Sequence, residues 1–225
     1  MIISDFSRHN ELFNPEAFED KVTVIGAGAT GSWLILALAR LGIQNITVYD
    51  FDTVAEHNIP NQAFALKHIG MNKAEAIAEQ VKEHTGYDIV AKTVPYTNQP
   101  LKGYVFCMVD SMAVRKDIWL KGIALKPLVK HYVEPRMGLE LGRVYNVTPT
   151  NTVHVKAYPE TLYGDENAEV SACGTSLTVV TSAMHIASVC ARQLITVANG
   201  GQVDNEIIID MAYNNLLTTN WKEGQ

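Results

Sequence analysis

The sequence predicts an α/β fold, a Rossmann-like, doubly wound, mostly parallel sheet with an antiparallel C-terminal edge. Three observations support this prediction. Short β-branched segments alternate with helical segments over the first 135 residues. A glycine-rich turn joins the first of these strands to the first helix. Beyond residue 136 the apolar and polar residues alternate, as is typical of antiparallel strands.

The first βαβ unit is complete within 30 residues. Residues 21–25 (KVTVI) form a β-branched run that stops at a glycine, as a buried strand does. Residues 29–41 are apolar almost all round and end at Gly42, a favourable helix C-cap. Residues 45–50 (NITVYD) form the second strand. Parallel strands in such a unit are buried on both faces.

The remaining elements follow in the same manner. Helical or β periodicity predicts, in chain order, a helix at 71–84, strands at 88–94 and 104–109, a helix at 111–125 and a strand at 127–133. Beyond these we expect strands at 139–147 and 152–158 around a turn at 148–151, an exposed crossover at 157–171, a long helix at 175–198, and a hairpin of 206–213 with 216–221 around Asn214-Asn215.

Composition limits the class of protein. The chain has 225 residues, of which 47% are hydrophobic and 19% charged, which is typical of a single globular domain. A net charge of −6 argues against a nucleic-acid partner, and no apolar run reaches the roughly 18 residues that span a membrane. The first 20 residues lack the pattern of a secretory signal, so we expect a cytoplasmic protein. Three cysteines without C-x-x-C spacing predict no structural zinc.

A nucleotide-binding turn is the clearest chemical motif. Gly26, Gly28 and Gly31 form G-x-G-x-x-G directly after a strand and at the start of a helix. Glycines permit a tight turn and close approach of the backbone, and the helix N-terminus offers amide donors to phosphate. Asp50 ends the second strand, where a carboxylate can accept hydrogen bonds from ribose hydroxyls. Alone, this motif would indicate an NAD-dependent oxidoreductase.

The residues after Asp50 indicate a different family. Asp50-Phe51-Asp52-Thr53-Val54, followed by Asn58 and Asn61-Gln62, resembles the D-x-D-x-V-x-x-x-N-L-x-R-Q run of ThiF, MoeB and the ubiquitin-activating enzymes. Further similarities are Gly70-Met71-Asn72-Lys73 to G-x-x-K, Asp110-Ser111 with Arg115 to D-[NS]-x-x-x-R, and Phe6-Ser7-Arg8-His9 to Y-S-R-Q. The matches keep their order from residue 6 to about 137. Together they are much more specific than the glycine motif.

The resemblance implies an ATP-dependent adenylyltransferase that acts as a homodimer. Its substrate would be the C-terminal carboxylate of a ubiquitin-like or sulfur-carrier protein that ends in glycine. One adenylation domain would cover 1–225, with an N-terminal arm (1–20), a nucleotide-binding half (21–135) and a carrier-protein-binding half (136–225). Asp50 would hold the ribose, Asp110 would bind Mg²⁺, and Asn58 and Lys73 would contact phosphates. Arg8 would reach the site of the partner subunit.

Several of these roles have simpler alternatives. Lys73 would otherwise be a solvated helix lysine and Asp110 a helix N-cap in competition with Ser111. Arg8 would be an ordinary surface residue, and Arg115 is equally well explained as a structural salt-bridge partner. Cys173, at the start of the predicted long helix, is the one candidate for a thioester-forming nucleophile, although packing as a small residue explains it too.

One departure from the family pattern bears on activity. The arginine of N-x-x-R-Q, which helps to clamp the triphosphate, is Asn61 here. Either Lys67, His57 or His68 compensates for the lost charge-assisted contact, or the nucleotide binds without efficient turnover. The second case would make the chain an inactive scaffold for an active partner subunit. An NAD-dependent oxidoreductase leaves Asn58, Lys73 and Arg115 unexplained.

Overall fold

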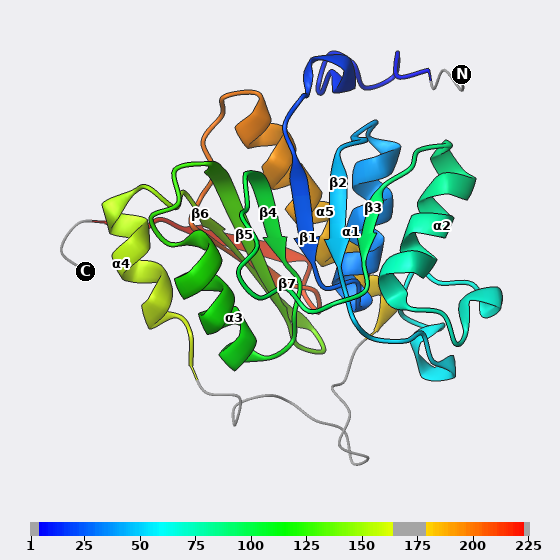
Figure 1. The fold of residues 1–225 in the computed structure, drawn as a ribbon. Coiled ribbons are helices and arrows are strands. Elements are labelled where there is room, and N and C mark those ends of the chain that lie inside the picture. The colour runs from blue at the N-terminus through cyan, green and yellow to red at the C-terminus, as the bar shows by residue number, and fades with distance from the viewer. Residues whose placement is uncertain (1–4, 164–178, 223–225) are drawn as a thin grey trace.

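The molecule is built on one central eight-stranded sheet (Figure 1). The structure, a computed structural model, describes residues 5–163 and 179–222. The strand order is β3-β2-β1-β4-β5-β6-β7-β8. The strands from β3 to β5 in this order pair in parallel, and β5, β6, β7 and β8 pair in antiparallel fashion. The strands are β1 (Val22–Ile25), β2 (Ile46–Tyr49), β3 (Val90–Lys92), β4 (Gly103–Cys107), β5 (Val129–Met137), β6 (Leu141–Val147), β7 (Glu206–Asp210) and β8 (Asn215–Thr219). The predicted fold class is confirmed.

Helices cover both faces of the sheet. The helices are α1 (Ala29–Arg40), α2 (Lys73–Thr85), α3 (Met112–Ile118), α4 (Thr152–Glu160) and α5 (Val180–Ala198). In Figure 1, α3 and α4 lie on the near face, and α1 and α5 on the far face. α1 packs against both α5 and α2. A π-helical turn, Trp119–Ile123, extends α3 toward β5.

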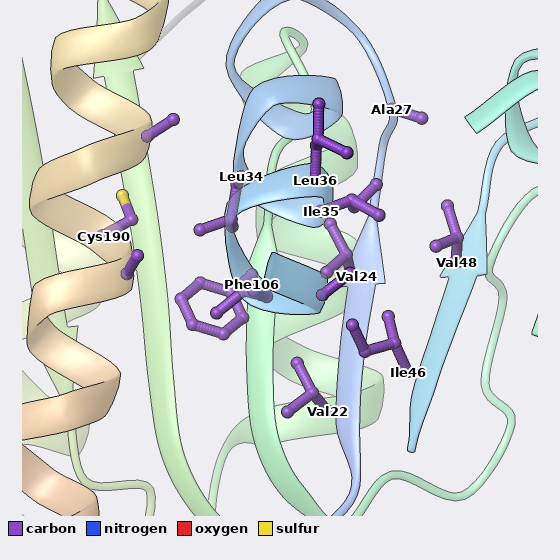
Figure 2. Close-up of a cluster of buried hydrophobic side chains, with 14 of the residues drawn as sticks. Val22, Val24, Ala27, Leu34, Ile35, Leu36, Ile46, Val48, Phe106 and Cys190 are labelled. Carbon is purple, nitrogen blue, oxygen red and sulfur yellow. The ribbon is translucent and has the colours of Figure 1, made fainter. Parts of the chain in front are cut away.

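Two apolar clusters fill the space between the sheet and these helices. The larger one joins β1 and β2 to α1, α2 and α5, and Figure 2 shows Ile35 of α1 beside Val24 of β1 and Leu34 on the side of α1 that faces α5. Phe106 of β4 and Cys190 of α5 belong to the same cluster and are buried. The smaller cluster lies under α3 and α4 and centres on Trp119, Tyr132 and Tyr158. The runs of β1, β2 and β4 are therefore buried on both faces, as expected, whereas the edge strand β3 is largely exposed.

Two predicted elements differ from the structure. The exposed crossover predicted at 157–171 begins inside α4, where Tyr158 is buried, and residues 164–171 lie outside the described residues. Residues 152–158 were expected to be a strand, but they lie in α4. The alternation of apolar residues there competes with a strong helix start, since the side chain of Asn151 accepts hydrogen bonds from the amides of Val153 (2.9 Å) and His154 (3.3 Å). β6 instead pairs with β5 on one side and β7 on the other. The expected hairpin around Asn214-Asn215 is present, with Asn214 in the left-handed region at φ 54°.

The N-terminal arm packs on its own chain. Phe13 is buried in the larger cluster, and Phe6 lies over Gly42 at the end of α1. Asn199, which follows α5, donates from its side-chain amide to the carbonyl of Leu12 (2.6 Å). The arm therefore docks within its own subunit, on the end of α1 and on the residue that follows α5.

Candidate nucleotide site

The three glycines of the turn are needed for different reasons. Gly26 follows β1 with φ +100°, and a Cβ there would lie 2.8 Å from the carbonyl oxygen of Met108. A Cβ on Gly31 would lie 2.2 Å from the carbonyl oxygen of Gly26, so Gly31 permits α1 to start against the turn. A Cβ on Gly28 would meet no atom of the described residues within 4 Å. The first two glycines satisfy internal packing, whereas Gly28 leaves space for something outside the chain.

The N-terminus of α1 faces the same space. Gly28 is its N-cap residue, and no side chain among the described residues caps it. The first amides of a helix have no partner within the helix, and together they carry a partial positive charge. An anionic group bound beside Gly28 would satisfy both requirements.

Asp50 fastens the glycine turn to the end of β2. One carboxylate oxygen accepts a hydrogen bond from the amide of Ala27 (2.6 Å) and the other accepts one from the amide of Asp52 (2.8 Å). Burial raises the pKa of Asp50, while these two hydrogen bonds and the charge of Lys73 act in the opposite direction. Each oxygen keeps one more lone pair with which to accept a hydroxyl hydrogen. Asp50 thus shapes the turn in addition to its predicted contact with ribose.

Lys73 is held at the start of α2 beside Asp52. Its residue is buried (8% exposed), and its ammonium lies 3.0 Å from Asp52 Oδ2. Asn72 caps the helix by accepting from the amides of Ala74 (2.9 Å) and Glu75 (3.4 Å), and its side-chain amide donates to the carbonyls of Asp50 and Asp52 (3.1 Å each). Lys73 is therefore not a freely solvated helix lysine. The sequence prediction missed Asn72, although an asparagine before an apolar-periodic run is a helix-start signal.

Asn58, Asn61 and Gln62 lie in the loop that follows Asp52. Asn58 is buried, and its side-chain oxygen accepts from the amide of Ala55 (2.9 Å), which shapes the loop. The indole N–H of Trp33 donates to the carbonyl of Asn61 (3.1 Å) and ties the loop to α1. Gln62 is buried, and its side-chain oxygen has no hydrogen-bond partner among the described residues. An orphaned buried acceptor next to the turn is a natural partner for a ligand donor or a water.

Two of the three cations expected to compensate for Asn61 are engaged elsewhere. The ammonium of Lys67 pairs with Glu79 (2.7 Å) and with Glu83, both on α2. The ring of His68 is fully buried and accepts from the amide of Ala65 (3.0 Å), and burial lowers its pKa. His57 is exposed on the same loop. The loop therefore holds Lys67 and His68 toward α2.

Asp110 and Ser111 follow β4 at the start of α3. Ser111 is the N-cap, because its hydroxyl accepts from the amide of Val114 (3.4 Å), and this leaves the exposed Asp110 available for other contacts. Arg115 is buried, forms an ion pair with Glu134, and donates to the carbonyls of Pro135 (2.8 Å) and Val109. This geometry supports the salt-bridge interpretation of Arg115 over a direct contact with ligand.

The sheet topology brings these groups to the carboxyl ends of the parallel strands. The strand order reverses between β1 and β4, and the register aligns Ile25 with both Tyr49 and Cys107. The glycine turn, Asp50 and the segment leading to Asp110 therefore leave the sheet at the same level. Ligands of open α/β sheets bind outside the carboxyl ends of the strands at such a switch point.

Arg8 lies at the opposite end of α1 from the glycine turn. It lines a groove with residues at the ends of α1 and α2, among them Arg40 and His84. α1 begins at the glycine turn and ends at Arg40, so Arg8 and the turn lie at opposite ends of this helix, as Figure 1 shows for the arm. Any contact of Arg8 with a nucleotide must therefore come from a second subunit. Cys173 lies outside the described residues.

Two features are absent from the described part of the chain. Residues 5–163 and 179–222 contain no group of three or more His, Cys, Asp or Glu side chains arranged to hold a metal ion. Within the same ranges, no helix has the length and hydropathy needed to cross a membrane.

The sequence as a whole matches a known family. A model of the ThiF family matches residues 6–224, almost the entire chain. The chain belongs to the ThiF family. Members of similar sequence include the tRNA threonylcarbamoyladenosine dehydratase of Escherichia coli (43% identical over 63 residues, 28% of this chain and 24% of that protein) and the NEDD8-activating enzyme E1 catalytic subunit of Caenorhabditis elegans (32% over 120 residues, 48% and 27%). The matched regions span about a quarter of these relatives.

Solved structures of low identity share the fold of this ThiF-family chain. E. coli MccB with MccA-N7isoASN superimposes with a TM-score of 0.74 at 16% identity, over 97% of this chain and 72% of that one. E. coli TcdA in complex with AMP superimposes with a TM-score of 0.63 at 18% identity, over 89% and 98%. At these identities the likeness establishes the fold alone.

Proposed function

We propose that this ThiF-family chain is an adenylyltransferase that uses ATP and Mg²⁺ to activate the C-terminal carboxylate of a small protein. The substrate would be a ubiquitin-like or sulfur-carrier protein ending in glycine. The carboxylate attacks the α-phosphorus of ATP, the bond from that phosphorus to the bridging oxygen breaks, and pyrophosphate leaves with the electron pair. The product is an acyl-adenylate.

The observation that carries the proposal is the open space at Gly28 against the uncapped N-terminus of α1. A phosphate fits there because backbone amides and the helix dipole both favour an anion. Asp50, beside the turn, has lone pairs for the ribose, and the buried ammonium of Lys73 supplies positive charge at the same edge. Charge on the transferring phosphate is the main obstacle in such a reaction, so positioned cations lower its barrier.

Asp110 is the residue that would hold Mg²⁺. It is an exposed carboxylate at the carboxyl end of β4, and hard oxygen ligands are those that Mg²⁺ prefers. Bound there, Mg²⁺ would neutralise phosphate charge. Lys73, now paired with Asp52, would turn from that carboxylate to a phosphate oxygen.

The substrate class rests on the family. Relatives include enzymes named for NEDD8 and SUMO as well as tRNA-modifying dehydratases, and a structural neighbour contains the peptide MccA. We propose a protein C-terminal carboxylate as the substrate. We also propose that the enzyme is a cytoplasmic homodimer. Arg8 of each subunit would act at the site of the other, because its own site lies at the far end of α1.

The loss of the family arginine at position 61 favours a second candidate function, that of an inactive scaffold. Asn61 replaces the family arginine, and the structure directs Lys67 and His68 toward α2. A chain with this weakened triphosphate clamp would serve as an inactive scaffold that stabilises an active partner. The presence of Asp110 after β4 and of the buried Lys73 beside Asp52 favours the active enzyme.

Calorimetry and exchange kinetics distinguish these functions. MgATP or AMP should bind at least tenfold tighter than NAD, and the reverse order would refute adenylation in favour of an oxidoreductase. Lys73→Ala and Asp110→Ala should abolish ATP–pyrophosphate exchange in the presence of the carrier protein. Lys82→Ala on α2 and Asp117→Ala on α3 are matched controls, because both residues form exposed ion pairs elsewhere on their helices. Exchange at wild-type rates in the first two variants would return Lys73 and Asp110 to structural roles.

A further inference from the structure

Glu134 carries a buried negative charge between two buried arginines. Its side chain on β5 is 0% exposed, and it pairs with Arg115 from α3 and with Arg136 two residues farther along β5. The guanidinium of Arg136 donates to both oxygens of Glu134, at 2.8 to 3.2 Å. Tyr158 of α4 adds a hydroxyl donor at 3.0 Å. The family motifs that identify the nucleotide site include neither Glu134 nor Arg136.

Stability alone does not explain such a cluster. Removing a carboxylate and guanidinium groups from water costs several kcal/mol per ion, and well-packed apolar residues often stabilise a core equally well. The benefit of a hydrogen-bonded polar cluster lies in fixing one arrangement of the groups around it. The question is therefore which segments the two arginines hold.

Arg115 holds the segment that leads to Asp110. Its guanidinium donates to the carbonyl of Val109, the residue before Asp110, and to the carbonyl of Pro135 on β5 (2.8 Å). Glu134 fixes the position of this guanidinium between the two carbonyls. The backbone before Asp110 is thus tied, through Arg115, to a buried carboxylate on the neighbouring strand.

Arg136 holds the end of α4 in the same way. It donates to the carbonyl (2.5 Å) and the hydroxyl (2.9 Å) of Thr161, and it lies over the rings of Tyr145 (4.3 Å to the centroid) and Tyr163 (5.4 Å). Met137, the next residue, accepts a weak hydrogen bond at its sulfur from the hydroxyl of Thr30 in the first turn of α1 (3.9 Å). Arg115, Arg136 and the adjacent Met137 therefore contact the segment before Asp110, the end of α4 and the first turn of α1.

We propose that Glu134 is a positioning residue that, through Arg115, sets the direction of Asp110 for binding Mg²⁺. The proposal rests on the proposed function for the role of Asp110. Its structural part stands apart from that function. Without the charge of Glu134, Arg115 loses its fixed position and the Val109–Asp110 segment loosens. The glycine turn should stay in place, because the bonds of Asp50 to the amides of Ala27 and Asp52 hold it.

Hydrogen exchange of the ligand-free protein tests the structural part. Glu134→Gln keeps the shape of the side chain and removes its charge. Amides within 109–116 should exchange at least tenfold faster, and amides within 22–49 should be unchanged. Glu206→Gln is the matched control, because it breaks the Arg143–Glu206 pair on the same sheet and should leave both regions unchanged. Unchanged exchange in 109–116, or uniform acceleration along the whole chain, would overturn the proposal.

Metal dependence tests the functional part. In Glu134→Gln, the Mg²⁺ concentration for half-maximal ATP–pyrophosphate exchange should rise at least fivefold, while AMP affinity stays within twofold of wild type. An AMP affinity that weakens as much as the Mg²⁺ requirement rises would show a general structural role and overturn the proposal. If Glu134→Gln does not fold, Arg115→Lys keeps the charge but removes the fork that spans two carbonyls, and the same split is expected. A wild type without exchange would refute the proposed function, and hydrogen exchange would still decide the role of Glu134.

Discussion

Gly28 and Gly31 differ in the distance from an added methyl group to the rest of the chain, and this difference predicts opposite phenotypes. In Gly31→Ala, the new Cβ would lie 2.2 Å from the carbonyl oxygen of Gly26 and 3.2 Å from the Cβ of Met108. Neither atom is at the flexible end of a side chain, so the turn or α1 must move. Overpacking of this kind costs about 1–3 kcal/mol. For a domain of this size the melting temperature should fall by roughly 2–12 °C.

In Gly28→Ala, the methyl group meets no described atom within 4 Å. The unfolding free energy should stay within about 0.5 kcal/mol of wild type, as for a substitution that disturbs no packing. If a phosphate occupies the space beside Gly28, the methyl group takes part of its place. A clash worth about 1–3 kcal/mol would weaken AMP binding roughly 5- to 150-fold.

Differential scanning calorimetry and titration calorimetry of the two variants measure both quantities. Gly28→Ala should keep its melting temperature and lose affinity, whereas Gly31→Ala should lose melting temperature. A folded Gly28→Ala protein that binds AMP as tightly as wild type would refute the placement of the nucleotide at this turn. A Gly31→Ala protein with an unchanged melting temperature would refute the packing argument.

Three further predictions concern pH, charge and assembly. Burial lowers the pKa of His131 from 6.5 to about 4 in the folded state, so the unfolded chain binds the proton first as the pH falls. The unfolding free energy should therefore decrease between about pH 6.5 and pH 4, by at most about 3 kcal/mol. In His131→Gln the melting temperature should depend less on pH over this range, and a slope equal to that of wild type would contradict the assignment. Asn61→Arg should restore a charge-assisted contact and tighten MgATP binding about tenfold with little effect on AMP, and equal changes for both ligands in calorimetry would place residue 61 away from the outer phosphates. Mixing Arg8→Ala with Lys73→Ala protein should restore exchange in up to one site of each mixed dimer, because one of its two sites keeps both residues; a strictly monomeric protein, or no recovery despite subunit exchange, would remove Arg8 from the site.

The sequence reveals the nucleotide-binding half well because its signals are local. The strand, glycine turn and helix of the first βαβ unit follow one another directly, and the same holds for Asp50 after β2 and Lys73 at the start of α2. Each depends on residues close in the chain, so periodicity and turn chemistry suffice.

The parts that escaped prediction depend on tertiary contacts or on competing local signals. The strand predicted at 152–158 is a helix, since the cap supplied by Asn151 prevails over the β-branched residues that follow it. Glu134 and Arg136 are charges beyond the strand predicted at 127–133, and the meeting of β5 with α3 and α4 explains them. The cis docking of the arm on α1 and α5 likewise has no local signature.

The double attachment of Asp50 has a kinetic consequence. With one oxygen bonded to Ala27 and the other to Asp52, Asp50 holds the glycine turn in one shape, so the proposed nucleotide would meet a turn that is already formed. A ligand that enters a preformed seat does not wait for the backbone to rearrange. Stopped-flow traces of nucleotide binding should then follow a single exponential whose rate rises linearly with nucleotide concentration.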